Sequence, residues 1–396
     1  MGKQIIGLFS FDGPLYRDKN GKYCSTTLTD EMFSRFFTVV EKIVVLVRVF
    51  DEAKSCEELN MKELHVDKLE IIGTENLVTP KGITVYKGRL EKKLYTILGN
   101  VDLVFARMPS LISDSVCKVC LELNKPYLVE VGGCAWDSYW NHGITGKAAA
   151  PLVYYWQKKY VANASFATYV TKEFLQRRYP NSNINTNCSN VYLQQVEQTV
   201  LQKRLDKIDS TDLRNIKVGQ VVASVDVKYK GEHYFVQVMS ELKKMGIRIT
   251  YEIVGPGSGS FILEQAEKYG VAEQVILTGA KKKEEVFEWL NSIDLYVQPS
   301  KQEGLPRSVI EAMSVGCPSV GSKIAGIPEL LDEDCLFNPD NIQQFTNVVI
   351  QLLEKNKMKT KAKTNFERAK EYNLADIEQR RKKIFEEYSR YISDKK

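Results

Sequence analysis

Two glutamates with a glycine and a proline between them are the residues of this chain whose spacing best suits chemistry on a phosphorylated ligand. Glu303 and Glu311 stand eight positions apart, with Gly304 and Pro306 between them. Gly304 lets the backbone approach a ligand closely, and Pro306 suits the first turn of a helix whose free amides attract anions. Carboxylates on both sides of such an anion site suit a ligand with hydroxyls flanking a diphosphate. A sugar nucleotide fits that description.

The sequence around this pair decides between two interpretations. Two glutamates at this spacing are common on solvated helices, and alone they would be read as surface residues. Here Pro299-Ser300 precedes them, and Gly316-Cys-Pro318 and Gly326-Ile-Pro-Glu329 follow. Together these residues resemble the Glu-x7-Glu signature of the retaining GT-B glycosyltransferases of family 4, of the bacterial surface-polysaccharide type.

The resemblance covers residues 215–355 and extends more weakly over the rest of the chain. It implies that Glu303 contacts the transferred sugar and Glu311 the ribose hydroxyls. Lys228-Tyr-Lys230-Gly231 is similar to the family's Lys-Gly motif, so Lys230 and the amides from Gly304 are expected to bind the donor diphosphate. Solvated loop charges are the alternative for both lysines of this motif. The other donor-binding residues that the resemblance implies are Gly255, Lys281, Leu305, Arg307 and Lys228.

Two positions depart from the family pattern. The family's arginine about six residues before the motif lysine is replaced by Ser224. Arg307 or Lys228 would then have to neutralise the leaving diphosphate. The family's histidine at the end of a first-domain strand is replaced by Gly132.

The stretch after Gly132 is the candidate acceptor loop, because it is rich in aromatic and polar residues, as a sugar-binding loop would be. Asp137 and His142 lie in it and are the candidates to replace the missing histidine. A purely structural loop is the alternative. Gly13, in the turn that closes the first strand, is expected to contact donor or acceptor, and Arg107 is a candidate cation at another strand end.

Short apolar runs that alternate with helical patterns position these motifs and predict parallel α/β folding. The strands expected in the first half are 4–9, 42–48, 69–72, 103–106, 127–131 and 167–171, and those in the second half are 216–222, 249–254, 275–278, 295–298, 318–321 and 336–337. This alternation of strands and helices forms two series, and a polar stretch around 198–214 lies between them. We therefore expect two doubly wound Rossmann-like domains, which face each other across a cleft in the GT-B fold. The expected domains are residues 1–200, which bind the acceptor and are joined by a C-terminal helix over 375–396, and residues 201–374, which bind the nucleotide sugar.

Charge is distributed unevenly along the chain. The net charge is +5, yet residues 355–396 alone carry a surplus of seven positive charges. The near-neutral body excludes a general nucleic-acid binder. The basic tail and the apolar run Ala148–Trp156, which lysines flank, are candidates for contact with an anionic membrane. A solvated helix face for the tail, and a buried helix for the apolar run, are the alternatives.

Cysteine spacing and the N-terminal residues favour a cytoplasmic protein without a metal site. Cys117 and Cys120 have metal-like spacing, but no second pair follows them at the distance of a zinc site. The apolar run near the N-terminus stops at Asp12, which is too early for a secretory signal. The resemblance likewise implies a reaction that needs no metal and no cofactor beyond the nucleotide sugar.

The function predicted is therefore transfer of a sugar, with retention, from a nucleotide diphosphate donor to a glycan or polyprenyl-linked acceptor. Uridine is the expected base. A sugar-nucleotide epimerase of the same architecture and a non-catalytic protein that binds sugar nucleotides are the alternatives.

Overall fold

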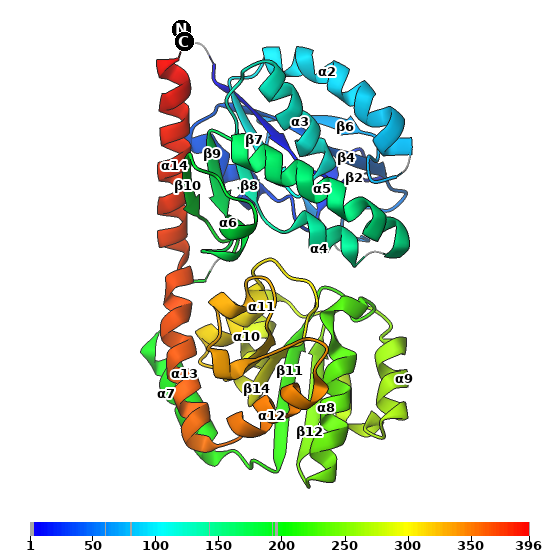
Figure 1. The fold of residues 1–396 in the computed structure, drawn as a ribbon, viewed down its shortest axis with the longest axis vertical. Coiled ribbons are helices and arrows are strands. Elements are labelled where there is room, and N and C mark those ends of the chain that lie inside the picture. The colour runs from blue at the N-terminus through cyan, green and yellow to red at the C-terminus, as the bar shows by residue number, and fades with distance from the viewer. Residues whose placement is uncertain are drawn as a thin grey trace. The chain divides into compact units, whose positions relative to one another are not determined.

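The computed structural model describes residues 4–59, 61–79, 81–141, 143–191, 193–194 and 197–395. The chain forms two compact units: a first unit of residues 1–188 and 378–396, and a second unit of residues 189–377. Figure 1 shows a sheet with covering helices in each unit. The predicted boundary after residue 200 falls inside a helix, Gln198–Ser210 (α7), whose buried face packs within the second unit.

The first unit is built on a sheet with the parallel strand order β6-β4-β1-β7-β8-β9-β10. Its parallel strands are β1 (Ile6–Ser10), β4 (Lys42–Asp51), β6 (Leu69–Thr74), β7 (Leu103–Met108), β8 (Leu128–Val131), β9 (Phe166–Tyr169) and β10 (Ile184–Asn187). The first six were predicted, whereas β10 is polar and was not. Because the chain winds outward in both directions from β1, the strand order reverses between β1 and β7. Ligands of doubly wound sheets bind at this switch point, beyond the carboxyl ends of the strands.

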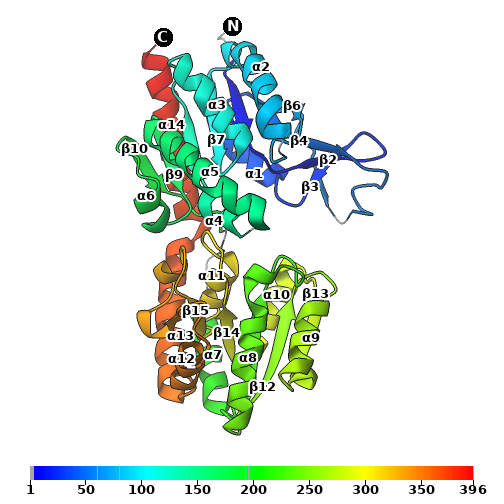
Figure 2. The ribbon, with the colours of Figure 1, turned by 45° about the vertical axis from the view of Figure 1, so that its right-hand side comes forward.

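Three short strands that the sequence did not predict extend the edge of this sheet. They are β2 (Leu15–Arg17), β3 (Tyr23–Ser25) and β5 (Lys62–Glu63). β2 pairs in parallel with the end of β4, and β3 runs antiparallel to both β2 and β5. Figure 2 shows this extension projecting from the first unit. Strands of two or three residues are too short for hydrophobic alternation to reveal them.

Helices cover both faces of the first sheet. One face packs against α2 (Lys87–Gly99), α3 (Leu111–Glu122) and α5 (Gly143–Asn163), which Figure 1 shows side by side. The other face packs against α1 (Asp30–Ser34) and the end of α14 (Leu374–Asp394). Phe385 of α14 stacks on Phe36, with ring centroids 5.5 Å apart, and the Tyr388 hydroxyl accepts a hydrogen bond from the Val104 amide at 3.0 Å. The last turns of the chain are therefore part of the first core.

The second unit repeats this topology without an edge extension. Its sheet is parallel and has the order β13-β12-β11-β14-β15-β16, so its switch point lies between β11 and β14. Its strands are β11 (Asn215–Val221), β12 (Arg248–Val254), β13 (Val275–Gly279), β14 (Leu295–Gln298), β15 (Ser319–Ser322) and β16 (Leu336–Phe337). All six were predicted within two residues at each end. The predicted doubly wound α/β fold is thus confirmed in both units.

Amphipathic helices also cover both faces of the second sheet. α8 (Glu232–Lys244), α9 (Ser260–Lys268) and α12 (Ile342–Leu352) pack on one face. α10 (Lys283–Ser292) and α11 (Arg307–Ser314) pack on the other face. α13 (Lys355–Ala369) packs against α7 through Met358, Ala362 and Phe366, which meet Leu201 and Ile208. The polar stretch around 198–214, where the domain boundary was predicted, therefore forms a helix with one buried stripe.

Among the described helices, none is both long enough and apolar enough to cross a membrane.

Candidate active site

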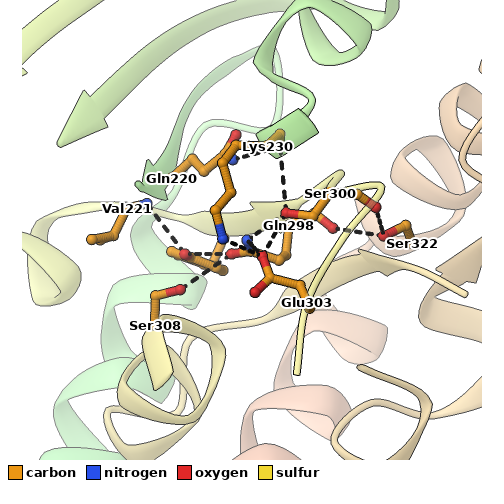
Figure 3. A network of polar contacts seen from close by, with 9 residues as sticks. Gln220, Val221, Lys230, Gln298, Ser300, Glu303, Ser308 and Ser322 are labelled. Atoms are coloured by element: carbon orange, nitrogen blue, oxygen red, sulfur yellow. Dashed lines mark hydrogen bonds and ion pairs between the residues drawn. The ribbon is translucent and has the colours of Figure 1, made fainter. Parts of the chain in front are cut away.

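The candidate site of the second unit lies at the carboxyl ends of β11 and β14, where the strand order reverses. Lys230 follows β11 in a short 3₁₀ turn, and Glu303 follows β14 in the loop before α11. Their side chains form an ion pair, with Lys230 Nζ 2.8 Å from Glu303 Oε1. The structure thus joins two residues that stand 73 positions apart, and Figure 3 shows them at the centre of a polar network.

Three donors converge on a single oxygen of Glu303. Besides Lys230, Gln298 Nε2 donates to Oε1 at 2.9 Å and the Ser300 hydroxyl donates to it at 2.7 Å. Within the described part of the chain, no hydrogen bond to the other oxygen, Oε2, is present, and Oε2 is not among the fully buried unpaired atoms. The carboxylate is therefore oriented by one oxygen and leaves the other for a ligand.

Gln298 fixes this orientation because all of its polar atoms are engaged. Its Nε2 also donates to Ser300 Oγ at 2.9 Å. Its Oε1 accepts from the Tyr296 hydroxyl at 2.8 Å and from Ser308 Oγ at 3.2 Å. Ser308 lies in the first turn of α11, so the network ties this helix start to β14. A polar residue at the end of a buried strand, as in Leu295–Gln298, is the signal by which Gln298 could have been found.

The Lys230 turn is held against the neighbouring strands. Gln220 Nε2 of β11 donates to the Lys230 carbonyl at 3.0 Å, and Tyr251 of β12 hydrogen bonds to Gln220 Oε1. Gly231 adopts a left-handed conformation (φ +82°), and a Cβ on it would lie 1.9 Å from the Pro299 carbonyl oxygen. Only glycine lets the chain pass this close to β14 and enter α8.

The first turn of α11 is a second part of the site. It begins after Pro306, which supplies no side-chain hydrogen bond to the helix amides. The first amides of a helix have no partner within it, so this helix start can accept an anion. Arg307 is exposed on the first turn, and Gly304 and Leu305 form the loop before it.

Glu311 lies one turn further into α11 and is largely buried. Burial raises the pKa of its carboxyl, and the charges of Arg307 and Lys283 partly oppose that rise. No hydrogen bond to this carboxyl is found among the described residues. A buried carboxylate without donors is costly, so a ligand with paired hydroxyls would stabilise its charged form.

The remaining predicted donor residues lie apart from the Lys230–Glu303 pair. Lys228 points its ammonium at the Phe261 ring, 4.1 Å from the ring centroid. Gly255 follows β12, and a Cβ on it would lie 2.6 Å from the Val222 carbonyl oxygen. Lys281 follows β13 and is half-buried. These positions stay predictions, because in the described part of the chain no hydrogen bond or ion pair links them to Glu303.

The sequence analysis missed one titratable group beside the site. Glu232, the first residue of α8, is 3% exposed, and its Oε1 is buried without a hydrogen-bond partner. Burial raises its pKa to about 8, against the opposing effects of its own backbone amide and of Lys230. Its charge gave no signal in the sequence, since a glutamate at a helix start normally faces solvent.

The first unit has a different arrangement at its switch point. Asp12, which follows β1, accepts the amides of Leu111 and Ile112 at 2.7 and 3.1 Å, and these open α3. Burial raises the pKa of Asp12, whereas the two amide hydrogen bonds lower it. Gly13, the next residue, packs against the ring of Phe11, which lies 5.4 Å from the Arg107 guanidinium.

The predicted acceptor loop of the first unit is a helix over part of its length. Asp137 lies in the first turn of α4 (Ala135–Trp140) and is 3.7 Å from the guanidinium of Arg178. His142 lies outside the described residues. Asp137 is thus paired within its own unit, and its role toward an acceptor stays a prediction.

Comparison with known proteins agrees with this architecture. The family profile for glycosyl transferases group 1 matches residues 217–355. Protein CapJ of Staphylococcus aureus is 32% identical over 391 residues, which are 98% of this chain and 96% of CapJ. The amylovoran biosynthesis glycosyltransferase AmsK of Erwinia amylovora is 34% identical over 112 residues, 26% of this chain and 28% of AmsK. The predicted surface-polysaccharide type fits these relatives.

A solved structure is similar over nearly the whole chain. The crystal structure of Anabaena Alr3699/HepE in complex with UDP has a TM-score of 0.62 at 14% identity, and the match covers 95% of this chain and 98% of that one. At this identity the likeness concerns the fold alone, and it supports the two-domain GT-B arrangement.

Proposed function

This chain belongs to the glycosyl transferases group 1 family, and from that membership we propose that it transfers a sugar from a UDP-sugar to a glycan acceptor. Membership makes it a glycosyltransferase with the GT-B fold. The donor, the retention of configuration and the acceptor are the proposed parts. The structural neighbour with bound UDP supports the choice of base.

The Lys230–Glu303 contact carries the proposal. Lys230 has two further N–H donors for the donor's phosphates, because only one of its three is used by Glu303. Glu303 Oε2 is available for a hydroxyl of the transferred sugar. A cation and a carboxylate in direct contact therefore match the junction between diphosphate and sugar.

Glu311 and the start of α11 complete the proposed donor site. Burial raises the pKa of the Glu311 carboxyl, and two vicinal ribose hydroxyls that donate to it would stabilise its charged form. The free amides that follow Gly304, together with Arg307, would receive the diphosphate. These groups meet the two phosphate charges without a metal ion, so we expect transfer to be unaffected by EDTA.

Retention follows in this proposal from attack on the same face as the departing diphosphate. The acceptor hydroxyl gives its proton to the leaving phosphate oxygen, and Glu303 orients the sugar without forming a covalent bond to it. Lys230 and the α11 amides stabilise the negative charge that grows on the phosphate. Catalysis then rests on positioning and on prearranged charge.

The acceptor is proposed to be a glycan or a polyprenyl-linked glycan of polysaccharide biosynthesis, and the enzyme to act in the cytoplasm. The amylovoran relative supports this pathway class. We assign the acceptor to the first unit because Asp12 already caps the helix start at its switch point, which leaves no open anion site there for the donor's phosphates.

Nucleotide release is the direct test. The protein is incubated with UDP-, GDP- and ADP-sugars, with and without a lipid-linked glycan acceptor, and the product's anomeric configuration is read by NMR. Acceptor-dependent UDP release with a retained anomer is the expected result. A new epimer formed without acceptor would establish the epimerase instead, and an inverted anomer would contradict the proposed mechanism.

A further inference from the structure

The outward side of α5 carries apolar side chains that the first unit does not use for packing. Ile144, Leu152 and Tyr155 are 88%, 47% and 59% exposed. Trp140 at the end of α4 stacks one face on Trp136, with ring centroids 5.0 Å apart, and is still 40% exposed. Ile144, Leu152 and Tyr155 are spaced so that they lie along one side of a helix. We call these four residues, with Lys147, Lys158 and Lys159, the α5 face.

The opposite side of α5 is firmly packed, so the exposed residues are not there to build the core. Val153, Tyr160 and Val161 are buried in the core of the first unit. Gln157 holds the helix further, donating to the Gly133 carbonyl at 2.9 Å and accepting the Ala135 amide at 2.8 Å. The helix therefore presents its apolar stripe on a fixed support.

Charge on α5 has a single sign. Its 21 residues, Gly143–Asn163, contain no aspartate or glutamate. Lys147, Lys158 and Lys159 are exposed, and in the described part of the chain they form no ion pair. Lys147 Nζ lies 5.6 Å from the Trp140 ring centroid, so apolar and cationic groups are interleaved. Aromatic and aliphatic residues flanked by unpaired lysines are the pattern of helices that bind at the surface of anionic membranes.

The first part of the basic C-terminal tail, α13, is engaged within the second unit. Lys361 pairs with Asp332 and Asp334, at 2.9 and 2.5 Å. Arg368 also pairs with Asp332, at 2.7 Å, and Lys359 pairs with Asp209. The apolar residues of α13 are turned inward, toward α7. Over its described residues, 355–395, the tail thus carries charge but exposes no large apolar side chain.

We propose that the α5 face binds the surface of an anionic lipid bilayer. Trp140, Ile144, Leu152 and Tyr155 lie at the level of the headgroups and upper acyl chains, and the three lysines contact lipid phosphates. If the chain uses a lipid-linked acceptor, as proposed above, membrane binding would bring it close to that acceptor. In this respect alone the membrane proposal rests on the proposed function. Binding itself needs neither donor nor transfer.

Vesicle sedimentation tests the proposal. The full chain is spun with vesicles of phosphatidylcholine alone and with vesicles that contain about one-third phosphatidylglycerol. The lysine variant is Lys147→Glu/Lys158→Glu/Lys159→Glu, and the apolar variant is Ile144→Ser/Tyr155→Ser. The matched control makes the same charge change on exposed tail lysines, Lys357→Glu/Lys363→Glu/Lys383→Glu.

The wild type is expected to sediment with the anionic vesicles and not with the neutral ones. Since each lysine near an anionic surface contributes roughly a fivefold change in partitioning, the lysine variant should bind at least about 100-fold more weakly. The apolar variant should also lose binding, and the tail variant should keep most of it. Loss of binding in the tail variant alone, or no binding by the wild type, would overturn the proposal.

Two further readouts separate this inference from its rivals. Sedimentation equilibrium without lipid measures self-association, and a wild-type dimer that the apolar variant abolishes would make the α5 face an interface between copies. Transfer to a water-soluble acceptor fragment is expected to be equal in wild type and lysine variant. If the wild type binds vesicles but transfers no sugar, the proposed function is contradicted and the proposal for the α5 face is supported.

Discussion

The two units share one topology, but the helix that starts at the switch point is capped by side chains in the first unit and is uncapped in the second. In the first unit the protein's own Asp12 carboxylate accepts the first amides of α3, and the Ser110 hydroxyl accepts the Ser113 amide at 3.0 Å. In the second unit α11 begins after Pro306, whose side chain accepts nothing.

This difference decides which unit can take a phosphate. A helix start already occupied by a carboxylate repels a second anion, whereas an open one attracts it. The second unit also supplies Lys230, and it anchors Glu303 by one oxygen. Equal topology therefore does not mean equal function, and the uncapped start of α11 is why we propose that the donor binds in the second unit.

The largest effect is expected from Lys230→Ala. Removing the lysine that contacts Glu303 directly should lower kcat/KM about 100- to 1,000-fold, because charge on the leaving diphosphate would lose a placed donor. Lys244→Ala, at the far end of α8 in an exposed pair with Glu241, is the matched control and should change little. Steady-state nucleotide release measures both, and equal rates in the two variants would remove Lys230 from the site.

Glu303→Gln tests whether Glu303 acts on the transferred sugar or on the nucleotide. The amide keeps the size of the side chain but loses the charge that orients the sugar, so kcat should fall about 100-fold. Affinity for UDP, which has no sugar, should stay within about threefold. A loss of UDP affinity as large as the loss of kcat would mean that Glu303 acts on the nucleotide.

Asp12→Ala tests the capped helix start of the first unit. Two amides at the start of α3 would lose their acceptor, which should lower the free energy of unfolding by about 2 kcal/mol. Asp12→Asn, which retains one acceptor oxygen, should lose less. Chemical denaturation measures both, and UDP affinity should be unchanged. Weaker UDP binding in the alanine variant would contradict the assignment of the donor to the second unit.

The effect of Glu232→Gln on stability depends on pH. In the folded protein Glu232 keeps its proton up to about pH 8, while in the unfolded chain it releases the proton near its ordinary pKa. The folded state thus binds more protons between these values, so this residue's contribution to stability falls as pH rises from about 5 to 8. A glutamine at this position does not titrate, so it contributes no such fall in stability with pH.

Thermal melts of the Glu232→Gln variant should therefore match wild type near pH 5 and exceed it by a few degrees at pH 8 and above. Glu241→Gln, an exposed position on the same helix, is the control and should show no pH-dependent gain. A gain for Glu232→Gln that is constant with pH would show that the carboxyl is already charged in the folded protein.

Much of this architecture could be predicted from the sequence because parallel strands are short, apolar and well separated. β14 was predicted with the bounds that the structure has, and the glycine and proline that follow Glu303 indicated the start of α11. The candidate site could be located from the sequence because Gly304, Pro306 and the two glutamates lie within nine residues.

The contacts that tune the site were not predictable, because they join distant segments. The capping of α3 by Asp12 spans about a hundred residues and depends on which strands are neighbours. The burial of Glu232 depends on the left-handed turn at Gly231 against Pro299. α7 was missed because its average composition is polar, although Leu201 and Ile208 form a buried stripe.

Closing the open helix start of the second unit tests the central claim most directly. Pro306→Asp would place a carboxylate at the N-terminus of α11, as Asp12 does for α3, and Pro306→Ser would place a neutral cap of similar size there. Calorimetric titration with UDP should show at least about tenfold weaker binding for the aspartate variant than for the serine variant. Equal UDP affinity in the two variants would contradict the claim that this helix start binds the donor.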